Sequence, residues 1–178
     1  MALVSVVVPC YNEENTVRLL LDAVNNQTFP RERMEVILAD GMSTDGTRRE
    51  IAAFQREHPE LEVRVVDNPR RIIPAGLNCA LAAATGEYII RLDAHSMPSR
   101  EYVERCVSAL RAGSGDNVGG VWEIRPSKDG WLAKSIAVAA SHPLGVGDAL
   151  YRYTTRAGLV DTVPFGAFRR VTFEKLGG

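Results

Sequence analysis

The sequence contains little cysteine and no cysteine spacing that suggests a metal site. Its 178 residues include three cysteines, Cys10, Cys79 and Cys106, and no two of them form a Cys-X-X-Cys pair. An odd number of widely spaced cysteines argues against disulfide bonds and against structural zinc. We therefore expect reduced thiols, as is usual in the cytosol.

Long apolar runs and an excess of basic charge are also missing. No segment approaches the roughly 20 uninterrupted apolar residues that a membrane-spanning helix requires. The apolar start, residues 1–8, has no basic region and runs directly into Pro9, so it predicts a strand and not a signal peptide. A net charge of −1 argues against a general nucleic-acid-binding surface. The sequence predicts a soluble chain that has no nucleic acid as a partner.

The signatures of several common phosphate and hydrolase sites are absent as well. There is no Gly-X-X-X-X-Gly-Lys-Ser/Thr loop and no Gly-X-Ser-X-Gly turn. Residues 145–148 imitate the start of a dinucleotide-binding motif, but the third glycine is missing and the stretch follows a predicted helix. A diphosphate bound by this protein would therefore be neutralised by a metal and by side chains.

Strands alternate with helices along the first half of the chain. Nearly continuous β-branched residues at 3–8 predict a strand that is buried on both faces. Three further strands are expected, at 34–40, 61–67 and 87–95. Between the strands, Asn12 is expected to cap the first helix and Ser99 to cap the helix after the fourth strand. This alternation predicts an α/β fold with a doubly wound, mainly parallel sheet and helices on both faces.

The second half of the chain is less regular. Its pattern predicts a strand at 117–123, a helix at 131–140, a long loop at 142–158 and an irregular strand at 159–168. No repeat or linker divides the chain. We therefore expect a single domain over 1–178, with a regular half at 1–97 and a less regular half at 98–178.

Acidic residues stand at the ends of the predicted strands. Open α/β sheets bind ligands at the carboxyl ends of their strands. Here those ends carry Pro9-Cys10-Tyr11-Asn12-Glu13, Asp40, Asp67 and Asp93-Ala94-His95. Residues two apart in extended backbone share a face, so Asp93 and His95 could close on one divalent cation. Converging carboxylates are costly unless they bind a ligand or a cation, which favours a ribose or base together with a metal-bound diphosphate.

Three segments in this order carry a family resemblance. Val6–Glu14, Asp40–Thr47 and Gly86–His95 resemble the ordered signatures of glycosyltransferase family 2, and Val160–Arg170 resembles its branch that builds succinoglycan-type exopolysaccharides. The resemblance covers essentially the whole chain. It implies the GT-A fold and inverting transfer of a sugar from a nucleotide diphosphate sugar, a UDP-sugar above all, to a glycan or lipid-linked acceptor in polysaccharide biosynthesis.

The resemblance also implies roles for individual residues. Pro9, Tyr11 and Glu13 would line the base and ribose pocket, Asp40 would bond the base or ribose, and Arg71 would face the diphosphate. Asp93 and His95 occupy the Asp-X-Asp metal motif of the family, with Asp93 also bonding the nucleotide sugar. Because imidazole suits softer ions, we expect Mn²⁺ to serve at least as well as Mg²⁺.

The resemblance implies that the catalytic base is a carboxylate downstream of the Arg-Arg and Gly-Gly segments, which we expect beyond Gly178. For Asp161 and Glu174, both acidic, we expect structural roles. On this interpretation the chain is truncated at its C-terminus: 1–97 is the nucleotide-binding half and 98–178 a partial acceptor half. We expect a cytoplasmic location, at the inner membrane face in the full-length protein, with membrane contact only through the region beyond Gly178.

Other classes of function are weighed against this one. The missing base leaves open a non-catalytic module that binds nucleotide sugars. A nucleotidyltransferase would need a glycine-rich phosphate loop near the first strand, and the sequence has none there. A flavodoxin-like phosphoacceptor would need a lysine on a late strand, which the pattern also does not supply.

Overall fold

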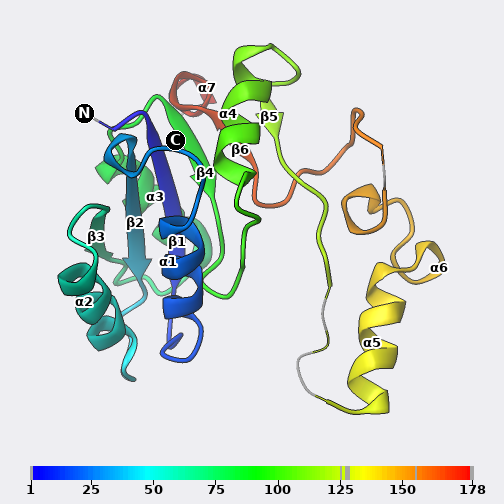
Figure 1. Cartoon of the computed structure of the whole chain (residues 1–178), viewed down its shortest axis with the longest axis horizontal. Coiled ribbons are helices and arrows are strands. Elements are labelled where there is room, and N and C mark those ends of the chain that lie inside the picture. Colours follow the sequence, from blue (N-terminus) through cyan, green and yellow to red (C-terminus); the bar gives the residue numbers. More distant parts are fainter. Residues whose placement is uncertain (1, 125, 127–128, 155, 177–178) are drawn as a thin grey trace. The chain divides into compact units, whose positions relative to one another are not determined.

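The computed structural model describes residues 2–124, 126, 129–154 and 156–176. Within them, a six-stranded sheet has the order β3-β2-β1-β4-β6-β5. Its strands are β1 (Val4–Cys10), β2 (Met34–Asp40), β3 (Glu62–Asp67), β4 (Tyr88–Arg91), β5 (Asn117–Val118) and β6 (Ala167–Arg169). The first four strands are parallel, and β6 runs antiparallel to both of its neighbours. The mainly parallel sheet predicted from the sequence is confirmed (Figure 1).

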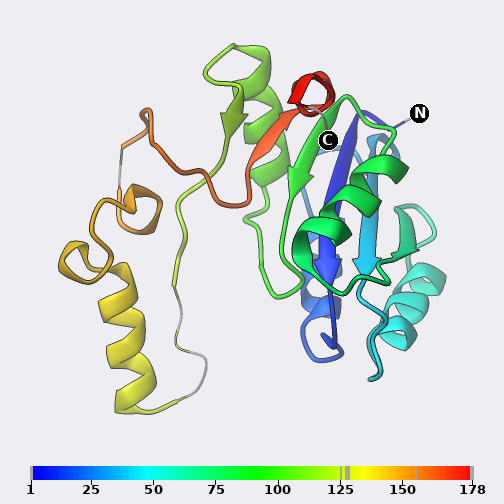
Figure 2. The ribbon, with the colours of Figure 1, turned by 180° about the vertical axis from the view of Figure 1, so that it is seen from behind.

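Helices cover both faces of this sheet. They are α1 (Val17–Asn25), α2 (Thr47–Glu57), α3 (Ile73–Ala83), α4 (Tyr102–Arg111) and α7 (Arg170–Leu176), with a short 3₁₀ turn, η1, at Arg31–Arg33. Figure 1 shows α1, α2 and α4 in front of the sheet, and Figure 2, from behind, shows α3 on the opposite face. The doubly wound arrangement is therefore confirmed. No helix within the described part of the chain is both long enough and apolar enough to cross a bilayer.

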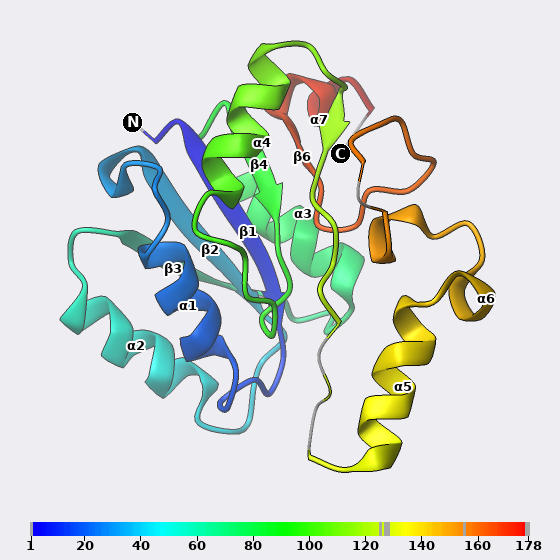
Figure 3. The ribbon, with the colours of Figure 1, turned by 45° about the vertical axis from the view of Figure 1, so that its right-hand side comes forward.

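The chain separates into two compact units. One comprises Met1–Val118 with Phe165–Gly178, and the other is Gly119–Pro164. The second unit contains α5 (Trp131–Ser141), α6 (Pro143–Val146) and a 3₁₀ turn, η2, at Leu150–Arg152 (Figure 3). The prediction of one long loop at 142–158 was thus wrong, because α6 and η2 lie within it. The functional division near residue 97 stays a prediction.

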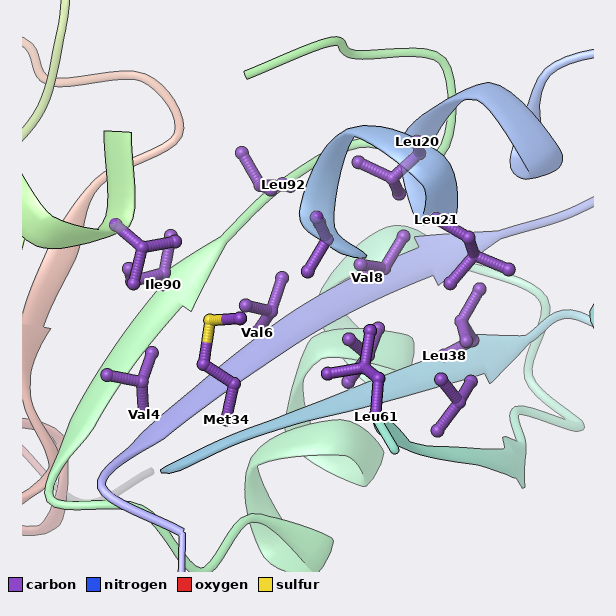
Figure 4. Packing of buried hydrophobic residues seen from close by; sticks show 14 of the residues in the cluster. Val4, Val6, Val8, Leu20, Leu21, Met34, Leu38, Leu61, Ile90 and Leu92 are labelled. Carbon is purple, nitrogen blue, oxygen red and sulfur yellow. The ribbon is translucent and has the colours of Figure 1, made fainter. Parts of the chain in front are cut away.

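Two hydrophobic layers hold the sheet unit together. The larger lies between the sheet and α1, α2 and α4, and Figure 4 shows its centre, which includes Val6, Leu20, Leu38 and Ile90. The smaller lies against α3 and contains Val7, Ile37, Ala39, Ala80, Ala84 and Ile89. Since β1 and β2 contribute to both layers, nearly every residue in them is apolar, which is why the sequence predicted them so closely.

Both predicted helix caps were wrong. Helix α1 begins at Val17 and not after Asn12, which has a positive φ of 54° and accepts a hydrogen bond from Thr44 N at 2.9 Å instead. The side chain of Ser99 does not cap α4, although its carbonyl accepts from Tyr102 N at 3.0 Å. In the first case a contact between two loops replaces the local cap that the sequence favoured.

A buried carboxylate lies at the amino edge of the sheet. Glu35 is fully buried and accepts hydrogen bonds from Ser5 Oγ at 2.6 Å, Thr85 N at 2.7 Å and Thr85 Oγ1 at 2.8 Å, and it pairs with Arg64. Burial alone would raise the pKa of Glu35, but these bonds together outweigh it and hold the pKa below its ordinary value. The carboxylate therefore joins β1, β2, β3 and the end of α3 while staying ionised.

Replacing Gly86 by alanine is expected to lower the free energy of unfolding by about 1–3 kcal/mol. Gly86 N donates to Ser5 Oγ at 2.9 Å, and a Cβ atom on Gly86 would lie 2.7 Å from both Ser5 N and Ser5 Oγ. Urea denaturation measures the change. Gly115→Ala is the control, because a Cβ atom there would come no closer than 3.4 Å to its neighbours. Equal losses in the two variants would contradict this steric account.

Candidate functional site

Three residues form a row across the carboxyl edge of the sheet. Cys10, Asp40 and Asp67 are register partners at the ends of β1, β2 and β3. Because the strands are parallel, the loops that follow β1, β2, β3 and β4 all leave from this one edge, where open α/β sheets bind their ligands. The predicted site residues lie along it.

The loops after β1 and β2 are tied together by hydrogen bonds. Asn12 N donates to Ser43 Oγ at 2.9 Å, and Glu13 N donates to Thr47 Oγ1 at 2.7 Å. Farther along, Glu14 accepts from Gly46 N at 2.7 Å. The loop after β1 and the loop after β2 are therefore joined to each other by hydrogen bonds and are not independent.

Tyr11 and Pro9 stand at the end of β1. Tyr11 is 48% exposed, and its ring lies beside Gly41, where a Cβ atom would approach Tyr11 Cδ2 to 3.3 Å. Pro9 is half-buried, and a Cβ atom on Gly76 of α3 would lie 3.5 Å from Pro9 Cβ. Glycine at these two places leaves room for the ring and for the close approach of α3. The exposed ring of Tyr11 offers a flat face to a ligand.

Asp40 is completely buried and is bonded within the protein. Its carboxylate accepts from Ser43 N at 3.1 Å, from Ser43 Oγ at 2.5 Å and from Arg48 Nε at 2.5 Å. Arg48 Nη2 also donates to Asp67 Oδ1 at 2.5 Å. The direct contact between Asp40 and a base or ribose, expected from the resemblance, would require Arg48 to move.

Sequence reasoning missed Arg48. The available signal was a basic residue in the first turn of α2, eight positions after the aspartate that ends β2. The hydrogen bonds to Asp67 and Asp40 raise the pKa of Arg48, so the guanidinium stays charged.

Cys10, the register partner of Asp40, is buried. This burial, followed by the Asp40 carboxylate, raises the pKa of the Cys10 thiol to about 12. The thiol is therefore protonated.

Arg71 lies in the loop after β3. Its φ is 55°, and its amide donates to Asn68 O at 3.1 Å, while Asn68 N donates to Asp40 O at 2.8 Å. The side chain is exposed, and no described residue forms an ion pair with its guanidinium. A free cation at this edge is suited to an anionic ligand.

Asp93 and His95 lie beyond β4, which ends at Arg91. The prediction that they share one face of a strand was therefore wrong, because both lie in the turn that follows. Asp93 Oδ1 accepts from Arg91 Nη2 at 2.8 Å, and His95 Nδ1 lies 3.2 Å from Glu13 Oε1. The structure thus brings His95 to Glu13, and Arg91, which sequence reasoning also missed, holds Asp93.

The side chains at this edge include metal-ligand groups that suit a divalent cation. No group of three or more His, Cys, Asp or Glu side chains capable of holding a metal occurs among the residues described. Ions such as Mg²⁺ are usually held by one or two carboxylates together with substrate phosphates, and imidazole suits Mn²⁺. The carboxylate of Asp93 and the imidazole of His95 fit such a site, which phosphate oxygens would complete.

Known proteins resemble this chain along its whole length. The model of the family Glycosyl transferase family 2 matches residues 5–177. The succinoglycan biosynthesis protein ExoA of Rhizobium meliloti is 31% identical over 175 residues, covering 97% of this chain and 52% of that protein.

Solved structures share the fold. The mannosyltransferase PcManGT of Pyrobaculum calidifontis, in complex with GDP-Man and Mn²⁺, is 30% identical, with a TM-score of 0.71 over 99% of this chain and 47% of that chain. TarS 1-349 of S. aureus in complex with UDP, at 21% identity, matches with a TM-score of 0.70 over 99% of this chain and 49% of that one. The chain therefore has the GT-A glycosyltransferase fold and spans about half the length of these relatives. The chain belongs to glycosyl transferase family 2.

Proposed function

We propose that this chain binds the nucleotide sugar donor of a glycosyltransferase that builds polysaccharide. The observation that carries the proposal is the contact between Glu13 and His95, at 3.2 Å, which joins two family motifs across the carboxyl edge of the sheet. The relatives support the same assignment, since one acts in succinoglycan biosynthesis and another was solved with GDP-Man and Mn²⁺.

Each residue at the edge has a proposed part in donor binding. Pro9 and Tyr11 line the base pocket, where the half-exposed ring of Tyr11 stacks on the base, and Glu13 accepts from the ribose hydroxyls. Arg71, which has no ion-pair partner among the described residues, faces the diphosphate. These roles use one aromatic face, one acceptor and one cation, which suit the base, the ribose and the diphosphate.

Asp93 and His95 would hold the divalent metal. Asp93 would also bond the nucleotide sugar. When bound, Mn²⁺ or Mg²⁺ would neutralise the charge that builds on the departing nucleoside diphosphate. Arg91 Nη2 donates to Asp93 Oδ1 at 2.8 Å and so orients the carboxylate. The residues of this chain thus bind and orient the leaving group.

The transfer step itself belongs to the proposal for the full-length protein. Inverting transfer needs a carboxylate that takes the proton of the acceptor hydroxyl. We propose that this base is separate from the donor residues above, and that the acceptor is a glycan or lipid-linked chain at the cytoplasmic face of a membrane. The half of the chain after residue 97 would serve the acceptor side.

Calorimetric titration tests donor binding. UDP or GDP is expected to bind in the presence of Mn²⁺ and to bind at least about tenfold more weakly in EDTA, because the metal shields the diphosphate from the strand-end carboxylates. Failure of every nucleoside diphosphate to bind would remove the donor-site proposal. Metal-dependent binding without sugar transfer by the full-length protein would instead favour a non-catalytic binding module.

A further inference from the structure

Helix α5 exposes its large apolar side chains. The exposed fractions are 81% for Trp131, 58% for Leu132, 60% for Ile136 and 64% for Val138. The buried residue of this helix is a small one, Ala137. A surface helix normally turns its large apolar residues toward the core and its polar residues toward solvent. In α5 this order is reversed, and an exposed apolar patch of this kind marks a surface that binds a partner.

The short helix α6 extends this apolar surface. Among the described elements, α5 packs mainly against α6, which follows it directly in the chain (Figure 3). An open groove of about 630 Å³ lies between the two helices, and Val138, Ala139 and Leu144 contribute to its mostly apolar walls. We call the exposed side of the two helices the α5–α6 face, which consists of Trp131, Leu132, Lys134, Ile136, Val138 and Leu144.

The charge of the α5–α6 face favours an anionic partner. Residues 130–147 contain one charged side chain, Lys134, and no Asp or Glu. Lys134 is exposed, and no described residue forms an ion pair with it. A symmetric contact between two copies of the face would bring two Lys134 side chains onto one patch that has no carboxylate to pair with them. Anionic lipid headgroups above acyl chains complement both the lysine and the apolar side chains.

The length of α5 suits a helix that lies on a bilayer. Its 11 residues extend over about 17 Å, whereas the hydrocarbon core of a bilayer is about 30 Å thick. Trp131 opens the helix, and tryptophan is enriched at the boundary between lipid and water because its ring is apolar and its N–H is polar. The aliphatic stem of Lys134 can lie along an apolar surface while its ammonium group reaches the headgroups. These features fit binding in the plane of the membrane surface.

We propose that the α5–α6 face binds the surface of an anionic phospholipid bilayer, with Leu132 and Ile136 among the acyl chains and Lys134 at the headgroup phosphates. This inference goes beyond donor binding and does not depend on it, because the face belongs to the segment Gly119–Pro164 and not to the carboxyl edge of the sheet. It assigns membrane contact to this chain itself, whereas the sequence led us to expect such contact only beyond Gly178.

Flotation of the full chain with vesicles, in the absence of nucleotide, tests the proposal. The unmodified protein is expected to bind vesicles of equal parts phosphatidylcholine and phosphatidylglycerol about fivefold more tightly than vesicles of phosphatidylcholine alone, since one lysine near an anionic surface strengthens binding by about this factor. Lys134→Gln should remove that preference. The double variant Leu132→Ser, Ile136→Ser should bind both kinds of vesicle at least about tenfold more weakly, because two apolar side chains no longer insert.

Tryptophan fluorescence provides a second measurement. Mixed vesicles are expected to shift the emission of the unmodified protein to shorter wavelength as Trp131 enters the bilayer, and Trp131→Phe should abolish the shift.

Leu19→Ser is the matched control, because Leu19 lies on α1 and is 51% exposed. This variant should bind vesicles as the unmodified protein does. Failure of the unmodified protein to bind either kind of vesicle, or equal losses in Leu19→Ser and the double variant, would overturn the proposal. A dimer that the double variant dissociates, without any vesicle binding, would instead assign the face to a second copy. Since no nucleotide is present, each of these failures leaves the donor-site proposal standing.

Discussion

Glu35→Ala is expected to lower the free energy of unfolding by about 3–5 kcal/mol, because it removes one partner from a buried ion pair. The substitution leaves Ser5 Oγ, Thr85 N and Thr85 Oγ1 without the acceptor that they share. Each polar group left unpaired in the interior costs about 1–3 kcal/mol. Urea denaturation followed by circular dichroism measures the loss.

Glu62→Ala is the matched control for this variant. Glu62 also pairs with Arg64, at 3.3 Å, but its side chain is 60% exposed. Exposed pairs contribute less than about 1 kcal/mol. A loss at Glu62 as large as that at Glu35 would show that the pairing with Arg64, and not the buried hydrogen bonds, determines the stability.

The difference between the unmodified protein and Glu35→Ala should also depend on pH. Since the pKa of Glu35 is lower in the folded chain than its ordinary value of 4.5, ionised Glu35 stabilises the fold fully above about pH 4.5. That contribution is lost as the pH falls through the folded-state pKa. The two proteins should therefore converge in acid, and a difference that stays constant below this range would contradict the role of the ionised carboxylate.

Asp93→Asn is expected to reduce Mn²⁺-dependent nucleotide binding by roughly 100-fold or more, since even outer partners of metal ligands cost up to about 100-fold. An amide oxygen is a weaker ligand than a carboxylate, yet it can still accept from Arg91, so the local geometry is preserved. His95→Ala should cost about tenfold. Calorimetry in Mn²⁺ and in EDTA separates the metal-dependent part.

The control for the metal variants is Asp22→Asn, which removes an exposed carboxylate on α1 that pairs with Arg18. It should leave binding unchanged in both conditions. Should Asp93→Asn and His95→Ala both retain the affinity of the unmodified protein in Mn²⁺, the assignment of the metal to this turn would be wrong.

The sequence was most informative where burial determines the residue type. The strands β1 and β2 are apolar on both faces, and their observed bounds differ from the predicted ones by at most two residues. Local signals were less reliable at the edge of the sheet. Asn12 has the character of a helix cap, but its side chain bonds the neighbouring loop at Thr44.

The residues of the candidate site were likewise predicted in part and missed in part. Sequence motifs located Glu13, Asp93 and His95 at one edge, because parallel strands bring their carboxyl ends together. They did not reveal Arg48 or Arg91, whose long side chains reach carboxylates at distances that only the packed loops determine. Strands were predicted at 117–123 and 159–168, but β5 covers only Asn117–Val118 and β6 only Ala167–Arg169, and so short a match gave no sign of their pairing.

The segment Gly119–Pro164 leaves and re-enters the sheet unit at adjacent points, because Val118 at its start pairs with Ala167 after its end. Antiparallel neighbours of this kind can be joined by a turn of a few residues. A change in the length of this segment is therefore expected to leave the hydrogen bonds between β5 and β6 in place.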